Sequence, residues 1–187
     1  MGHQKPTISV IIPHVSGEQF DRLLKSCVDS LVGFDELIIL SSPMGTPGFT
    51  EKVNQGLTLA RGDFLMVVNN DIKLTQGSLI DLCKENSVTS PKMNGKAQSF
   101  WGCFFVIPRK VYETIGLLDE QFELYCSDTD LVMRLREAGI PYECVESCNI
   151  ETEGGVTTRA LVDRERIEDE DTNRFISKWG IHPSQAI

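Results

Sequence analysis

Three short apolar runs, each separated from the next by a segment with helical periodicity, constrain this fold more than any other feature. Residues 8–12 read ISVII, residues 37–40 read LIIL and residues 64–68 read FLMVV. Between them, apolar residues recur at helical spacing over residues 20–31 and 50–60. Strands and helices that alternate at this spacing require right-handed crossovers. The sequence therefore predicts an α/β fold with a mostly parallel central sheet flanked by helices.

The second half of the chain predicts a more mixed set of elements. Its patterns predict strands at 87–89, 100–107 and 142–145, and helices at 109–115, 128–138 and 160–179. Residues 151–158 are polar and contain two glycines, which predicts a loop. No internal repeat or low-complexity linker interrupts the chain. We therefore expect a single domain over residues 1–187, with halves of about 7–90 and 91–180.

Composition narrows the class of protein. The chain has 187 residues and a net charge of −9, which disfavours a general nucleic-acid scaffold because such binding needs clustered Lys and Arg. Its apolar runs are too short to span a bilayer, so no transmembrane segment is expected. The six cysteines form no C-x-x-C pair, which favours reduced thiols and a cytoplasmic location.

The sequence lacks the motifs of several common enzyme classes. The first strand is not followed by G-x-G-x-x-G, and the chain contains neither a P-loop nor a G-x-S-x-G sequence. Its only histidines are His3, His14 and His182, which leaves few candidates for a triad. A dinucleotide fold, a P-loop enzyme and a serine hydrolase are therefore disfavoured.

Polar residues follow the three apolar runs, where the carboxyl ends of parallel strands form the binding edge of a sheet. They are Pro13 and His14, Ser41 and Ser42, and the triplet Asn69, Asn70 and Asp71. A carboxylate at this edge suits Mg²⁺ or Mn²⁺, with water and a diphosphate as further ligands. The alternative is that the triplet only forms the turn after the strand.

Two further segments carry acidic residues. Asp128 and Asp130 open a strongly patterned helix after Ser127. One interpretation makes Ser127 an N-cap with Asp130 as its capping-box partner, and the other makes a carboxylate the general base toward an acceptor hydroxyl. In the loop at 151–158, Glu151 or Glu153 is placed to reach a metal, although a solvated acidic loop is the alternative.

The order of these segments resembles the inverting glycosyltransferases of family 2, which have the GT-A type of nucleotide-diphospho-sugar transferase fold. The resemblance spans residues 8–180, nearly the whole chain. The blocks that carry it are ISVIIP at 8–13, NQGL through ARGD at 54–63, NND at 69–71, WG through LLDEQF at 101–122, DTDL through REAG at 128–139 and FISKWG at 175–180.

The resemblance implies a nucleotide-binding first half and an acceptor and catalytic second half. It implies nucleoside-diphosphate-sugar contacts from Pro13, His14, Ser41, Asn54, Asn69 and Asn70. It places Mn²⁺ or Mg²⁺ at Asp71 with Thr152, and makes Asp128 the general base, with Asp130 next in line. The acceptor stays open among a glycan, a lipid, a protein and a modified nucleic acid.

Three positions depart from the family pattern. Ser41 stands where the family has an Asp, Ser127 replaces a Glu, and Thr152 replaces a His. These departures keep an alternative open, namely a degenerate protein that binds a nucleotide sugar or a partner without transfer. A nucleotidyltransferase is a third interpretation, but residues 14–18 lack the Gly- and Arg/Lys-rich loop that it requires.

Overall fold

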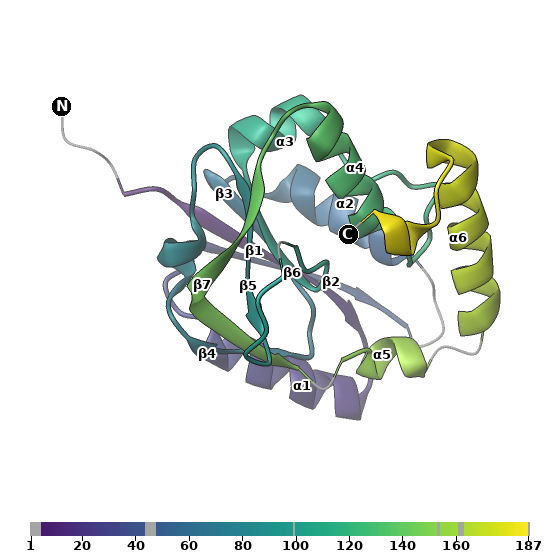
Figure 1. The fold of residues 1–187 in the computed structure, drawn as a ribbon. Helices are drawn as coiled ribbons and strands as arrows, with labels where there is room; N and C mark the ends of the chain where they lie inside the picture. Colours follow the sequence, from purple (N-terminus) through teal and green to yellow (C-terminus); the bar gives the residue numbers. More distant parts are fainter. Residues whose placement is uncertain (1–4, 44–47, 99, 153, 161–162, 187) are drawn as a thin grey trace.

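The computed structural model in Figure 1 describes residues 5–43, 48–98, 100–152, 154–160 and 163–186. Seven strands form one sheet in the order β2-β1-β3-β6-β5-β7-β4. The strands are β1 (Ile8–Val15), β2 (Glu36–Ser42), β3 (Phe64–Val68), β4 (Ile72–Gln76), β5 (Val88–Met93), β6 (Phe104–Pro108) and β7 (Tyr142–Thr152). The α-helices are α1 (Glu18–Ser30), α2 (Phe49–Leu59), α3 (Arg109–Ile115), α4 (Ser127–Glu137), α5 (Val156–Arg159) and α6 (Arg164–Trp179). Two 3₁₀ turns, η1 (Leu79–Leu82) and η2 (Pro183–Gln185), complete the fold.

The sheet is mixed, and only its first three strands follow the predicted parallel order. β1 pairs in parallel with β2 and β3, and β5 pairs in parallel with β7. β6 runs antiparallel to both β3 and β5, and β4 runs antiparallel to β7. The segment between β5 and β6 contains no crossover helix, which a parallel pair would need. The helices that flank the sheet are as predicted.

Strand lengths differ most from the prediction at the site edge. β1 continues through Pro13 to Val15, where a strand end was predicted at the proline. Its pairing with β3 ends at Ile11, so the missing Pro13 N–H breaks no bond on that side. β7 runs to Thr152 instead of ending near residue 145, and β4 was not predicted. These extensions bring residues 71 and 152 to the same edge.

Helices bury both faces of the sheet. Adjacent residues of β1 face opposite sides, so β1 contributes to the apolar cluster on each face. Ile8, Val10 and Ile12 join an apolar cluster with α1, whereas Ile11 joins a second cluster with α2, α3 and α4. Figure 1 shows α1 on one side of the sheet and α2, α3 and α4 on the other. A strand buried on both faces reads as a continuous apolar run, which is why the sequence identified β1 and β3.

The C-terminal helix α6 packs differently from the others. Phe175 of α6 lies in a third, smaller apolar cluster with Phe122 and Cys126, and the Phe122 and Phe175 ring centroids are 6.3 Å apart. Figure 1 shows α6 beside the N-terminal part of α4, away from the strands. Within the described part of the chain, no helix has both the length and the apolar character needed to cross a bilayer.

Candidate functional site

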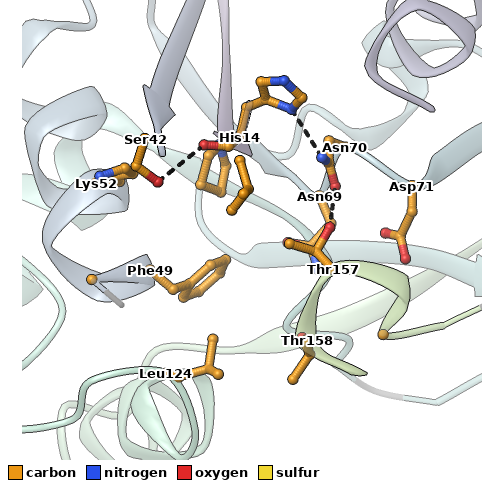
Figure 2. A pocket seen from close by; sticks show the side chains of 14 residues that line it. His14, Ser42, Phe49, Lys52, Asn69, Asn70, Asp71, Leu124, Thr157 and Thr158 are labelled. Atoms are coloured by element: carbon orange, nitrogen blue, oxygen red, sulfur yellow. Dashed lines mark hydrogen bonds between the residues drawn. The ribbon is translucent and has the colours of Figure 1, made fainter. Parts of the chain in front are cut away.

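A cavity lies at the carboxyl ends of the parallel strands β1, β2 and β3. Figure 2 shows Asp71 at one end and Lys52 at the other, with the Phe49 ring between them. The side chains come from three strand ends, the start of α2, the segment before α4, and α5. The lining residues are Pro13, His14, Val15, Ser42, Gly48, Phe49, Lys52, Asn69, Asn70, Asp71, Leu124, Gly155, Thr157 and Thr158.

A hydrogen-bonded chain fixes the polar side of this cavity. The amide Nδ2 of Asn70 lies 2.9 Å from Nδ1 of the buried His14, and His14 Nε2 lies 2.9 Å from Asp21 Oδ1. Because the amide donates, His14 Nδ1 accepts and Nε2 carries the proton that it donates to Asp21. This bond lowers the pKa of the Asp21 carboxyl. Asn70 Oδ1 accepts from the Thr157 hydroxyl at 3.3 Å, which links the strand ends to α5 (Figure 2).

Asp71 lines three cavities of the protein surface. It lines the main cavity, a groove that also contains Glu151, and a smaller cavity that also contains Asn94; Thr152 lines both of these neighbours. The register between β4 and β7 pairs Ile72 with Thr152, which explains the proximity. The structure therefore brings the two predicted metal residues together, although the other acidic candidate, Glu153, lies outside the described residues.

The oxygen atoms around Asp71 fit a hard divalent cation. Asn69 Oδ1 is buried without a hydrogen-bond partner, and Asn69 lines the same two cavities as Asp71. The Thr152 hydroxyl accepts from the Gly154 N–H at 2.9 Å and keeps a second lone pair. Across the described residues, no three His, Cys, Asp or Glu side chains gather as a metal cluster. Such a site therefore depends on phosphate and water for most of its ligands, as Mg²⁺ sites do.

Asp128 lies at the start of α4 in a crowded position. Its Oδ1 accepts from the Thr129 N–H at 2.8 Å. Its Oδ2 faces Gly102 so closely that a Cβ on that glycine would lie 1.9 Å away. Burial raises the pKa of the Asp128 carboxyl. A carboxylate with a raised pKa is a better proton acceptor, which suits the predicted base.

Cys103, immediately before β6, lies close enough to both acidic candidates for their charges to affect its thiol. Burial raises the pKa of its thiol to about 12, and the charges of Asp71 and Asp128 add to the effect. Cys103 also lines the smaller cavity beside Asp71. Asp128 packs against Gly102, and the next residue, Cys103, lines the smaller cavity with Asp71, so these two adjacent residues connect the surroundings of the two carboxylates.

Asp130 has a structural position. Its side chain is fully buried, and it accepts from Arg134 Nε at 2.8 Å, Lys178 Nζ at 2.7 Å and Trp179 Nε1 at 2.9 Å. These three donors come from α4 and α6 and use both oxygens of the Asp130 carboxylate. The arrangement assigns Asp130 to the junction of α4 and α6 and leaves Asp128 as the candidate base.

The predicted capping box at this helix is wrong. Cys126, in the left-handed region at φ 62°, is the N-cap, and its side chain makes no capping bond. Ser127 is already helical, and its buried Oγ has no partner. The bend at Cys126 places the helix start one residue earlier than the sequence pattern indicated.

Asn54 and Ser41 do not face the cavity. The Asn54 amide donates to Leu118 O and to Glu120 Oε1, both at 2.9 Å, and its oxygen accepts from Leu118 N–H at 2.9 Å. All its polar atoms are therefore used to hold residues 118–120. Ser41 is exposed, and its neighbour Ser42 lines the cavity because successive side chains of a strand alternate. For both residues, nucleotide contact stays a prediction that this geometry does not support.

Several lining residues were not identified from the sequence. Phe49 and Lys52 lie at the start of α2, after the loop that follows β2. The rule that ligands bind where a strand leads into a helix would have found them. Leu124 and Thr158 carry no local signal, because distant segments of the fold bring them to the cavity.

The structure has the GT-A fold of nucleotide-sugar glycosyltransferases. It matches GalNAc-T7 bound to UDP, GalNAc and Mn²⁺ with a TM-score of 0.62 at 12% identity, covering 94% of this chain and 51% of that one. It matches a mannosyltransferase from Pyrobaculum calidifontis bound to GDP-mannose and Mn²⁺ with a TM-score of 0.59 at 11% identity, covering 94% and 65%. It matches glucosyl-3-phosphoglycerate synthase from Mycobacterium tuberculosis, bound to Mn²⁺, UDP and glucosyl-3-phosphoglycerate, with a TM-score of 0.58 at 14% identity, covering 94% and 81%.

No family model and no curated protein matches the sequence. The chain spans about half the length of GalNAc-T7 and about two thirds of the mannosyltransferase. At these identities the likeness establishes the fold, and function has to be argued from the site.

Proposed function

We propose that this protein is a metal-dependent glycosyltransferase that moves a sugar from a nucleoside-diphosphate sugar to an acceptor hydroxyl, with inversion. The observation that carries the proposal is the cavity at the carboxyl ends of β1, β2 and β3, which Asp71 lines. Asp128 packs against Gly102, whose neighbour Cys103 lines the smaller cavity beside Asp71, so the candidate base belongs to the same region of the fold. The three similar structures, each solved with Mn²⁺ and a nucleotide or nucleotide sugar, support it.

The main cavity supplies the donor site in this proposal. Phe49 offers an aromatic face for the base, and Pro13 and His14 line the same cavity. Lys52 makes no ion pair within the described part of the chain, so its ammonium is available to an anionic or carbonyl group. The His14–Asn70–Thr157 bonds hold α5 beside the diphosphate position.

Asp71 would hold Mn²⁺ or Mg²⁺, with Asn69 Oδ1 and the Thr152 hydroxyl as nearby oxygen atoms. When bound, the cation neutralises the charge of the departing diphosphate. Asp128 takes the proton of the acceptor hydroxyl while the acceptor oxygen bonds to the anomeric carbon, and the diphosphate leaves with the electron pair of the broken bond. The Thr129 N–H orients Asp128 for this transfer by fixing Oδ1.

A second candidate function is a nucleotide-sugar-binding protein without transfer. Two features favour it: Asp71 is the only carboxylate among the described residues that line the main cavity, and Thr152 stands where the related family has a histidine. The two functions differ in turnover and agree in donor binding.

Calorimetric titration of the purified protein with UDP, GDP, dTDP and CMP, each with and without Mn²⁺, tests the donor site. We expect one nucleoside diphosphate to bind in a Mn²⁺-dependent manner. Asp71→Ala should abolish the Mn²⁺ dependence, whereas Asp29→Ala, which removes an exposed carboxylate of α1, should leave it unchanged. Equal binding by Asp71→Ala would remove the metal site. Metal-dependent binding without transfer to any acceptor would favour the second candidate.

A further inference from the structure

The C-terminal helix α6 makes several contacts with residues 122–125, the segment that precedes α4 and Asp128. Arg164 Nε donates to the Tyr125 hydroxyl at 3.0 Å. At the other end of α6, Lys178 and Trp179 donate to Asp130. The helix therefore packs along residues 122–130, the stretch that contains the candidate base.

Asp171, in the middle of α6, makes the densest of these contacts. Its side chain is fully buried, and its two oxygens accept from three successive backbone N–H groups. Oδ1 lies 3.0 Å from Glu123 N, and Oδ2 lies 2.9 Å from Leu124 N and 2.8 Å from Tyr125 N. Arg174 adds an ion pair at 2.8 Å. Three adjacent donors that converge on one anion define a concave backbone conformation that the anion stabilises.

The segment held by Asp171 supplies two parts of the site. Leu124 lines the main cavity, and Cys126 turns the chain at φ 62° into α4 two residues before Asp128. A left-handed non-glycine residue persists only where its surroundings determine it. Asp171 holds the three residues before this turn, so the position of Asp128 against Gly102 depends on it.

We propose that Asp171 is a positioning residue for the candidate active site: the Asp171 carboxylate sets the backbone of residues 123–125 and thereby the placement of the Leu124 wall and of Asp128. This inference rests on the proposed function for its catalytic consequence, but the placement itself is measurable without activity. Because the clusters on the two faces of the sheet contain no α6 residue, we expect the sheet to form in Asp171 variants.

The variants Asp171→Asn and Asp171→Glu test this role, with Glu170→Gln as the matched control. Glu170 lies next to Asp171, pairs with Arg166 and Arg174, and bonds to no backbone N–H of the segment. In Asp171→Asn the amide NH₂ replaces one acceptor oxygen and faces N–H donors, so residues 123–125 lose part of their anchor and the negative charge that stabilises it. We expect turnover to fall about 10²-fold, the scale of a 1 Å misplacement of a reacting group. Nucleotide affinity should fall less than tenfold, and Asp171→Glu should recover part of the turnover.

Two readouts separate this proposal from the proposed function. Amide exchange at Leu124 and Tyr125 should accelerate in Asp171→Asn, and the Asp128 carboxyl, followed by carbon NMR, should titrate closer to its ordinary pKa. Glu170→Gln should match the wild type in both. If Asp171→Asn matches Glu170→Gln in exchange, titration and turnover, Asp171 is not a positioning residue. If the wild-type protein transfers no sugar but exchange and titration respond as expected, only the proposed function fails.

Discussion

At the scale of a single residue, Asp128 is the proposed base and lies where its charged form is unfavourable for folding. Its half-buried carboxyl packs against Gly102, where desolvation raises its pKa, and it accepts from the Thr129 N–H. A group whose folded-state pKa lies above its unfolded value favours folding when protonated. Stability from this group is therefore present at low pH and is lost as pH rises through the folded pKa. At neutral pH the charged Asp128 destabilises the protein.

Asp128→Asn should therefore gain stability while it loses activity. The amide keeps an acceptor for Thr129 and removes the buried charge, so we expect a higher thermal unfolding midpoint at pH 7. The difference from the wild type should close as pH falls toward 3.8, the ordinary Asp pKa. Donor binding should persist, and turnover should fall by roughly 10²-fold or more. Calorimetric scans from pH 4 to pH 8 measure the first effect. A variant that is less stable at pH 7, or fully active, would contradict this role.

The site residues predictable from the sequence are those that follow a buried strand directly. Pro13, His14 and the triplet that ends in Asp71 were placed correctly, because the end of a parallel strand fixes the edge on which its next residues lie. Asn54 does not line the cavity, and no sequence pattern shows that the distant residues 118–120 use all its polar atoms.

Asn54 joins two elements and belongs to that scale. It ties α2 to the loop before α4 through three hydrogen bonds in a buried position. Asn54→Ala leaves the Leu118 groups without partners, which should cost roughly 2–4 kcal/mol of unfolding free energy. Nucleotide affinity should stay unchanged.

Urea unfolding and calorimetry measure the two effects of this change. Gln55→Ala, on the same helix with one exposed bond to Glu51, serves as the control and should cost less than about 0.5 kcal/mol. A stable Asn54→Ala variant with lost nucleotide affinity would instead support a direct nucleotide contact.

Elements with a local sequence signal were predictable. Strands that form only because they pair with a distant strand were not. β3 and α3 have the predicted bounds, because an apolar run and a Gly stop define them locally. β4 and the second half of β7 are polar, and they form strands because they pair with each other. α6 begins at Arg164, four residues later than predicted.

At the scale of the whole molecule, all six cysteine thiols are buried or half-buried. Burial raises the pKa of all six cysteine thiols, and that of Cys27, Cys83, Cys103 and Cys126 to about 12. A thiol is nucleophilic only as the thiolate, so reaction at pH 8 should be slow in the native protein. Absorbance assays with an aromatic disulfide should show fast reaction of six thiols only in denaturant. Rapid reaction of all six in buffer would refute this expectation.

Because β6 runs antiparallel to β3, its first residue lies beside the last residue of β3, and its last lies beside the first: Val68 pairs with Phe104, and Phe64 with Pro108. The chain therefore enters β6 at the site edge and leaves it at the opposite edge. None of the candidate site residues described above lies at that opposite edge, around residues 60–63 and 108–109. An insertion between residues 94 and 103 would shift Gly102 and Cys103 against both carboxylates, so that connection should keep its length.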